Sequence, residues 1–143
     1  RQRGELSRGV TERYHKHVKA IFQVGDTRSN DWSTVLGYPA ELVPLRNPYS
    51  IAPGDTLAIR CLVNGQPAPR QYVMIGGRRG AAGDVRLRPA AARCDDNGVV
   101  QVPLPTAGRW FVKFIHMTRV NDGEADYESV WASLTFEVRA PRR

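Results

Sequence analysis

Cysteine is scarce in this chain of 143 residues, which holds only Cys61 and Cys94. Two cysteines are too few for a disulfide scaffold, and they lack the short C-x-x-C spacing of a zinc site. Long hydrophobic runs are absent as well, since no apolar stretch approaches the roughly 20 residues that span a bilayer. Helical periodicity is missing beyond a turn or two. These absences exclude small disulfide-rich, membrane-spanning and mainly helical proteins.

Motifs of nucleophilic catalysis and phosphate binding are also missing. No G-x-S-x-G elbow occurs, and Cys61 falls on the apolar side of a predicted strand, where a thiol is inert. The glycine-rich stretch 76–80 lacks the Gly-Lys-Ser/Thr ending of a phosphate loop and precedes no predicted helix. We therefore expect a protein that is not an enzyme and holds no resident cofactor.

Basic residues, by contrast, are in excess. Lys and Arg number 21 against 14 Asp and Glu, which gives a net charge of +7 and a pI near 10.0. This charge favours acidic partners or anionic surfaces. Nucleic acid is a poor candidate, because the arginines are scattered and no stripe of aromatics interleaves with them. Hydrophobic residues make up 41% of the chain, close to the average of globular domains.

Short segments with the period of a strand run along the chain, separated by Pro, Gly, Asn and Asp. The predicted strands are 14–25, 40–45, 56–63, 71–75, 99–104, 109–117 and 130–138, with a weak edge strand at 85–88. In the first of them Val18, Ala20, Phe22 and Val24 alternate with polar residues, as in a half-buried strand. The pattern predicts an all-β fold, an antiparallel β-sandwich of about seven strands, Ig-like or transthyretin-like.

Two local signals add detail to the predicted sandwich. Asn64-Gly65 is a strong hairpin signal and predicts that 56–63 returns through 71–75. The segment 109–117 is apolar on both faces, which predicts a central strand.

Residues 1–13 are polar and without period, and they precede the sandwich of 14–138 and a basic tail at 139–143. Such an arm cannot bury enough apolar area to order itself, so we expect it to lie against another chain, its arginines facing carboxylates or lipid phosphates. These arginines are Arg1, Arg3, Arg8 and Arg13. The sequence does not begin with methionine. We expect that an upstream segment either has been removed from the protein or is left out of this numbering.

The order of several motifs resembles the DUF4198 family of bacterial extracytoplasmic proteins. The runs that carry the resemblance are YHKHVKAIFQVGD, LGYPAELVPLRNPYSIAPGDTLAIRCLVNGQPAP, DDNGVVQVPLPTAGRWFVKFIHM and ADYESVWASLTFEV. The resemblance implies an exported β-sandwich related to transthyretin-like and carbohydrate-binding-like modules, placed in the periplasm or otherwise outside the cytoplasm. Members are often described as associated with nickel or cobalt uptake. Many carry a His-containing amino-terminal segment that this sequence does not show.

Three histidines are the candidate metal ligands. His15 and His17 lie two apart and so point to one face of a strand, where two imidazoles could share a transition metal such as nickel or cobalt. Lys19 continues that face and its charge opposes a cation. A third ligand, His116, would have to come from a distant strand. Solvated surface histidines, or a buried hydrogen-bonded His116, are the competing interpretation.

The acidic clusters favour turns over calcium sites. Asp95-Asp96-Asn97-Gly98 lacks the ligand spacing of an EF-hand and has ordinary hairpin chemistry. A second acidic group, in the last loop, is at most a weak hard-cation site. It consists of Asp122, Glu124, Asp126 and Glu128.

The most economical prediction is a binding domain, an accessory or assembly subunit that docks on another protein or a membrane-associated complex with an acidic surface. Irregular segments on a rigid sandwich usually carry recognition. The expected contacts, besides the arm, are Trp32, Tyr38, Arg78, Arg79, Arg86 and Arg88. Metal handling is the first alternative, and a carbohydrate-binding module with Trp32 and Tyr38 stacked on a sugar is the second. Cys61 and Cys94 are expected to form a disulfide if the protein is exported.

Overall fold

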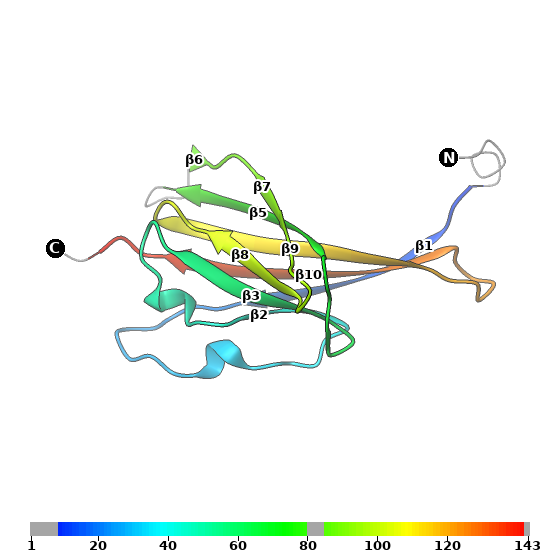
Figure 1. Ribbon diagram of the computed structural model, residues 1–143, viewed down its shortest axis with the longest axis horizontal. Helices are drawn as coiled ribbons and strands as arrows, with labels where there is room; N and C mark the ends of the chain where they lie inside the picture. Colours follow the sequence, from blue (N-terminus) through cyan, green and yellow to red (C-terminus); the bar gives the residue numbers. More distant parts are fainter. Residues whose placement is uncertain (1–8, 80–84, 142–143) are drawn as a thin grey trace.

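Strands arranged in two sheets form a β-sandwich, shown in Figure 1. The computed structural model describes residues 9–79 and 85–141. The predicted all-β class and sandwich architecture are confirmed, with ten strands where about seven were expected. The helical elements are two single turns, η1 (Asp31–Ser33) and η2 (Pro48–Ser50). Across the described ranges, no helix has the length and apolar character to cross a membrane.

The larger sheet has six strands in the order β1-β10-β9-β5-β6, and β7 also pairs with β5. Its strands are β1 (Glu12–Ala20), β10 (Tyr127–Val138), β9 (Gly108–Arg119), β5 (Tyr72–Arg79), β6 (Val85–Arg86) and β7 (Ala90–Arg93). β1 runs parallel to β10, whereas the other pairs are antiparallel. β9 lies between β10 and β5, so the prediction of a central strand at 109–117 is confirmed.

The smaller sheet packs its apolar face on the larger one. Its strands are β2 (Ala40–Pro44), β3 (Thr56–Val63), β4 (Gln66–Pro67) and β8 (Val99–Pro103). Leu57, Ile59 and Cys61 alternate along β3 and are fully buried, as the period-two pattern predicts. They meet Val112 and Phe114 of β9 in the core between the sheets.

The Asn64-Gly65 hairpin forms, and a strand forms at the predicted 71–75 as part of β5, but the prediction that this strand is the return strand of the hairpin is wrong. Both turn residues have positive φ, 51° and 79°, which a two-residue hairpin turn of this type requires. The returning strand is the short β4, and β5 then crosses to the larger sheet. The cause is that Val73 and Ile75 are buried in the core as part of the larger sheet, where Ile75 pairs with Val112 of β9. The tail of the predicted excursion also pairs, as β7, although its sequence Ala-Ala-Ala-Arg has little strand preference.

β1 forms where a strand was predicted, but its apolar side faces outward. Val18 is 70% exposed, whereas Lys19 points into the sandwich and is 9% exposed. The strand also begins at Glu12, so the predicted arm of 1–13 ends two residues earlier than expected, and residues 1–8 lie outside the described part of the chain. β1, β9 and β10 extend past the end of the smaller sheet, as Figure 1 shows. Part of the inner face of the larger sheet is therefore uncovered.

Candidate binding face

Three arginines stand side by side on the outer face of the larger sheet. Arg78 of β5 is the register partner of both Arg109 in β9 and Arg86 in β6, and residues directly opposite each other share a face. All three are exposed. Among the residues that the structure describes, no carboxylate forms an ion pair with Arg86 or Arg109. Beyond Arg109 the same row continues to Glu137 of β10, which is the register partner of Arg109 and forms an ion pair with Arg139. Like charges directly opposite each other disfavour a sheet, so a further anion bound over the arginines would reduce their repulsion.

A hollow of about 360 Å³ opens beside the three arginines. Its floor includes Gly76, Gly77 and the ring of Phe111, and Leu87 and Pro89 border it. The ring of Phe111 lies so close over Gly76 that a Cβ there would overlap it. The absence of a side chain at Gly76 therefore lets the ring of Phe111 lie across β5, where it forms the apolar floor between the arginines. Such a hollow suits a carboxylate carried on an apolar chain.

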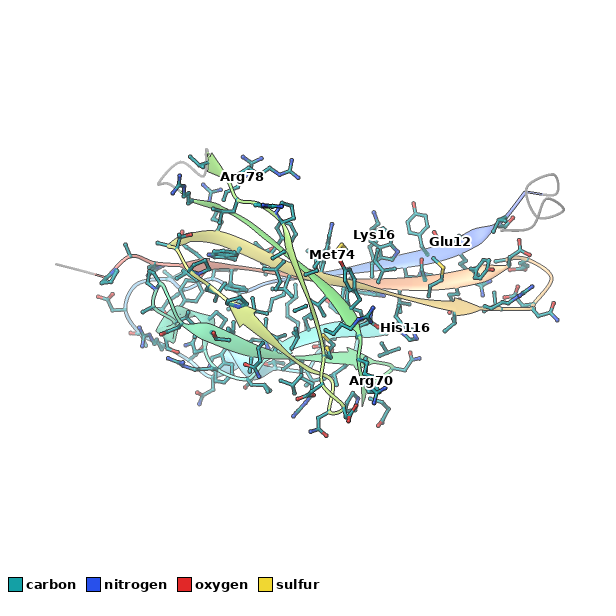
Figure 2. All side chains as sticks on the ribbon, turned by 45° about the horizontal axis from the view of Figure 1, so that its top comes forward. Glu12, Lys16, Arg70, Met74, Arg78 and His116 are labelled. Atoms are coloured by element: carbon teal, nitrogen blue, oxygen red, sulfur yellow. The ribbon has the colours of Figure 1, made fainter. Side chains whose placement is uncertain are left out.

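Aromatic rings with cations above them are distributed over the same face from β7 to β1. The Nζ of Lys16 is 4.6 Å from the ring centre of Trp131, and the Nζ of Lys113 is 5.6 Å from that of Phe111. The guanidinium of Arg93 is 5.4 Å from the ring centre of Tyr72. Figure 2 shows Lys16, Met74 and Arg78 along this side of the sheet. Among the described strands of the larger sheet, the acidic residues on this face are Glu12, at the start of β1, and Glu137, which lies opposite Arg109 at the end of the arginine row. The face is therefore apolar and basic.

The sequence predicted only part of this face. The predicted contact arginines are all exposed, but Arg79 alternates with Arg78 and so points to the other side of β5. The others are Arg78, Arg86 and Arg88. Arg109 was not predicted, because it comes from a strand about 30 residues further along the chain and only the pairing of β5 with β9 brings it to Arg78. No sequence signal marks that register.

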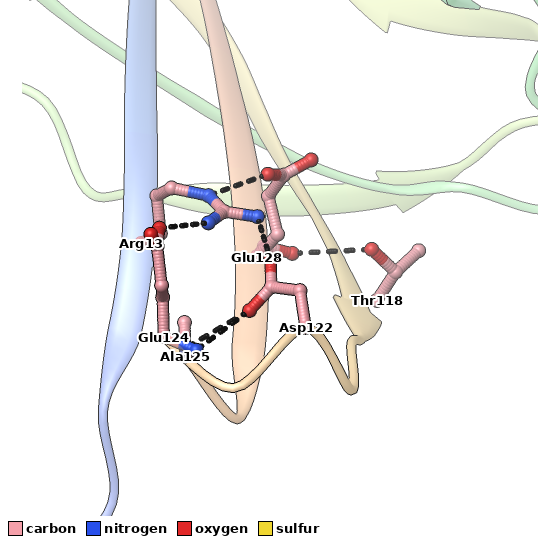
Figure 3. Close-up of polar contacts among 6 residues, drawn as sticks. All are labelled: Arg13, Thr118, Asp122, Glu124, Ala125 and Glu128. Carbon is pink, nitrogen blue, oxygen red and sulfur yellow. Dashed lines mark hydrogen bonds and ion pairs between the residues drawn. The ribbon is translucent and has the colours of Figure 1, made fainter.

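Arg13 binds carboxylates of its own chain. Its Nε donates to Glu128 at 2.8 Å and its Nη2 to Asp122 at 2.7 Å, as Figure 3 shows. The hydrogen bond to Asp122 raises the pKa of Arg13 and holds the pKa of Asp122 at about 2. Asp122 also accepts from the backbone N–H of Glu124 and Ala125, which is turn chemistry. Arg13 therefore fastens β1 to the β9–β10 turn. The other arginines of the predicted arm, Arg1, Arg3 and Arg8, lie outside the described residues.

The three candidate metal ligands separate into two places. His15 and His116 flank Val130 on the uncovered inner face and border one hollow together with Glu128. The Nδ1 of His116 lies 3.3 Å from the side-chain oxygen of Gln71. His17 instead stacks on Tyr38, with ring centres 5.2 Å apart. Within residues 9–79 and 85–141, no group of three or more His, Cys, Asp or Glu side chains could hold a metal ion. Metal binding by these histidines stays a prediction, which a nickel titration of wild type and His17→Ala tests.

Trp32 and Tyr38 do not form one platform. Trp32 borders a hollow at the end of β1 with Phe22 and Tyr49, whereas Tyr38 stacks on His17 and does not line that hollow. The predicted turn at 95–98 is confirmed, since Asp95 accepts from the backbone N–H groups of Asn97 and Val99.

Cys61 and Cys94 are free thiols buried in the core. The interaction between them, together with burial, raises the pKa of Cys61, and the same interaction lowers the pKa of Cys94. The two cysteines are neighbours although 32 residues separate them in the sequence. The predicted disulfide stays a prediction.

Comparison with known proteins gives a family and no function. A model of the family described as "Domain of unknown function (DUF4198)" matches residues 2–118. No curated protein and no solved structure matches the chain. Since the match covers well over half of the sequence, the chain belongs to the DUF4198 family.

Proposed function

We propose that this protein is a non-enzymatic binding domain that docks on an acidic surface of another protein through the outer face of its larger sheet. The row of Arg78, Arg86 and Arg109 is the observation that carries the proposal. Three cations in register across adjacent strands repel one another, and Glu137, which forms an ion pair with Arg139, faces only the Arg109 end of the row. Carboxylates of a partner would reduce the repulsion further. The proposal places the protein outside the cytoplasm, as an accessory subunit of a larger assembly, in line with the family resemblance.

The apolar side chains of the face can supply binding free energy that a row of exposed charges alone would not. Phe111 is 36% exposed and Tyr72 46% exposed, and each ring has a cation above it. Aromatic side chains and arginines are the groups that most often dominate the free energy of protein association. Charged groups steer the encounter and set the register. A partner with alternating acidic and apolar side chains therefore matches both the row and the hollow beside it.

A pull-down from solubilised cell envelopes tests the proposal. The bait is the wild type and a variant in which the row is reversed, Arg78→Glu, Arg86→Glu and Arg109→Glu. The matched control reverses Arg28, Arg46 and Arg70, which are exposed elsewhere, so that both variants lose the same charge. We expect one partner to be retained by the wild type and the control but lost from the row variant. We also expect the captured amount to fall at high salt, because exposed charges are screened within about 8 Å at 0.15 M.

Two results would contradict the proposal. If the row variant retains the same partner as the wild type, the arginines do not dock it. If both variants lose it equally, net charge alone holds it and the face is not a specific site.

A further inference from the structure

β1 is an open edge of the larger sheet. The N–H of Ile21 donates to the carbonyl of Thr135, and the carbonyl of Thr11 accepts from the N–H of Asp126. In a parallel ladder the N–H and C=O of one residue point the same way, so odd-numbered residues of β1 face β10 and even-numbered ones face away from the sheet. These outward groups belong to Tyr14, Lys16, Val18 and Ala20, and none of them has a hydrogen-bond partner within the described part of the chain. Such an edge is a template for another strand.

Apolar side chains accompany this edge on its outer side. Tyr14 is 58% exposed and Val18 is 70% exposed. The stripe continues past the end of β1 through Phe22 and Val24, which are 77% and 81% exposed. Contiguous exposed apolar side chains of this size mark an interaction site. The edge therefore offers both backbone hydrogen bonds and an apolar strip.

We propose that a second copy of this chain occupies the edge, its β1 paired antiparallel with this one about a two-fold axis at Val18. In that register Val18 lies opposite the partner's Val18, and Tyr14 lies opposite the partner's Phe22. Lys16 lies opposite the partner's Ala20, so no two like charges face each other on the outer side. A register centred on Lys16 would instead oppose two lysines, which is unfavourable. The outward stripe of β1 is thus complementary to itself when it is read in the reverse direction.

The position of Lys16 leaves the edge accessible. Lysines on edge strands commonly prevent pairing by projecting over the edge. Here the Nζ of Lys16 is held 4.6 Å from the ring centre of Trp131 and 5.6 Å from that of Tyr14, above the face of the sheet. Pairs within β1 would exchange about six backbone hydrogen bonds, two for each hydrogen-bonded pair.

The dimer and the proposed acidic docking respond to salt in opposite directions. Two copies with a charge of +7 each repel one another, so screening strengthens their pairing. Screening weakens the attraction of the arginine row for an acidic partner. The arginine row also lies across β9, β5 and β6, away from the β1 edge, so either proposal can fail without the other.

The dimer can be tested by measuring the molar mass of the purified full chain by light scattering, over a series of protein concentrations at low and at high salt. We expect a mass twice that of the 16.0 kDa monomer. The dimer should form at a lower protein concentration when the salt concentration is high. Val18→Lys places two charges opposite each other at the axis and should give a monomer. Thr135→Lys adds the same charge on the same face but away from the edge, and should remain dimeric. Circular dichroism confirms that both variants fold.

Cysteine cross-linking fixes the register. Hydrogen-bonded antiparallel pairs have Cα atoms about 5.5 Å apart, within the range of a disulfide. Val18→Cys should therefore cross-link two copies under mild oxidation, whereas Tyr14→Cys should do so only together with Phe22→Cys. A monomer at every concentration and salt, or a dimer that Val18→Lys leaves intact, would overturn the proposal. Cross-linking by Tyr14→Cys alone would overturn the register.

Discussion

Lys19 and Glu41 form a buried ion pair that joins the two sheets. The Nζ of Lys19 in β1 lies 2.6 Å from the Oε2 of Glu41 in β2, and Glu41 is only 2% exposed. Lys19 also donates to the carbonyl of Leu42. The carboxylate accepts further hydrogen bonds from the backbone N–H groups of Leu36 and Gly37. The pair can be buried because the opposite charge and the surrounding hydrogen bonds offset the cost of removing both groups from water. Either charge buried alone would be strongly destabilising.

Lys19→Met should therefore destabilise the protein by about 3–5 kcal/mol, because it leaves the Glu41 carboxylate buried without its cation. Urea unfolding gives the loss. The double variant Lys19→Met/Glu41→Gln should lose less, since no uncompensated charge remains. The matched control is Arg70→Met, which removes the exposed pair with Asp96 and should cost about 0–1 kcal/mol. A Lys19→Met loss as small as that of the control would contradict the role of the pair.

Glu41 should make stability depend on pH in the acid range. Burial raises the pKa of Glu41, but the hydrogen bonds from Lys19 and from the N–H of Leu36 outweigh it, and the pKa lies below its ordinary value of 4.5. A group whose pKa is lower in the folded state stabilises the protein above its unfolded pKa. That contribution is lost as the pH falls below 4.5 and through the folded pKa. Glu41→Gln should flatten this part of the stability curve, and an unchanged slope would show that other carboxylates produce it.

Asp122 reports whether Arg13 holds β1 on the β9–β10 turn. The hydrogen bond from Arg13 is the largest cause of its pKa of about 2. In Arg13→Gln, an NMR titration should find the Asp122 pKa raised toward its ordinary value of 3.8, with part of the lowering left by the N–H groups of Glu124 and Ala125. Arg119→Gln is the control. An Asp122 pKa that stays near 2 in Arg13→Gln would mean that the turn alone lowers it.

Cys61 and Cys94 should form a disulfide when the protein is refolded under oxidising conditions. Both are free and buried in the core, and each shifts the pKa of the other. Mass spectrometry after alkylation should find no free thiol, and the closed loop of about 33 residues should contribute roughly 3–4 kcal/mol relative to the reduced protein. Two alkylated cysteines after such refolding would contradict the prediction and leave both as core side chains.

Local patterns in the sequence are sufficient to predict most of the strands. The alternation of Leu57, Ile59 and Cys61 places their side chains in the core because one face of β3 is covered along its whole length. The same argument fails for β1, where the buried position of Lys19 depends on Glu41 in another strand. Alternation indicates that two faces differ, and only the neighbours of a strand decide which face is covered.

The candidate face shows a second limit. Arg78 and Arg86 lie close in sequence and were predicted together, but the row is completed by Arg109 through the register of β5 with β9. Phe111 comes to Gly76 by the same pairing. Strand register between distant segments depends on packing of the whole sheet, which a single sequence pattern does not contain.

NMR mapping of an acidic probe tests the central claim most directly. Hexaglutamate is titrated at low salt into the protein and into the row variant Arg78→Glu/Arg86→Glu/Arg109→Glu, with backbone amides followed individually. The account predicts shifts concentrated at 76–78, 86–87 and 109–111, saturating together and absent from the row variant. Shifts of equal size around Arg28, Arg46 and Arg70, or none at the arginine row, would contradict it.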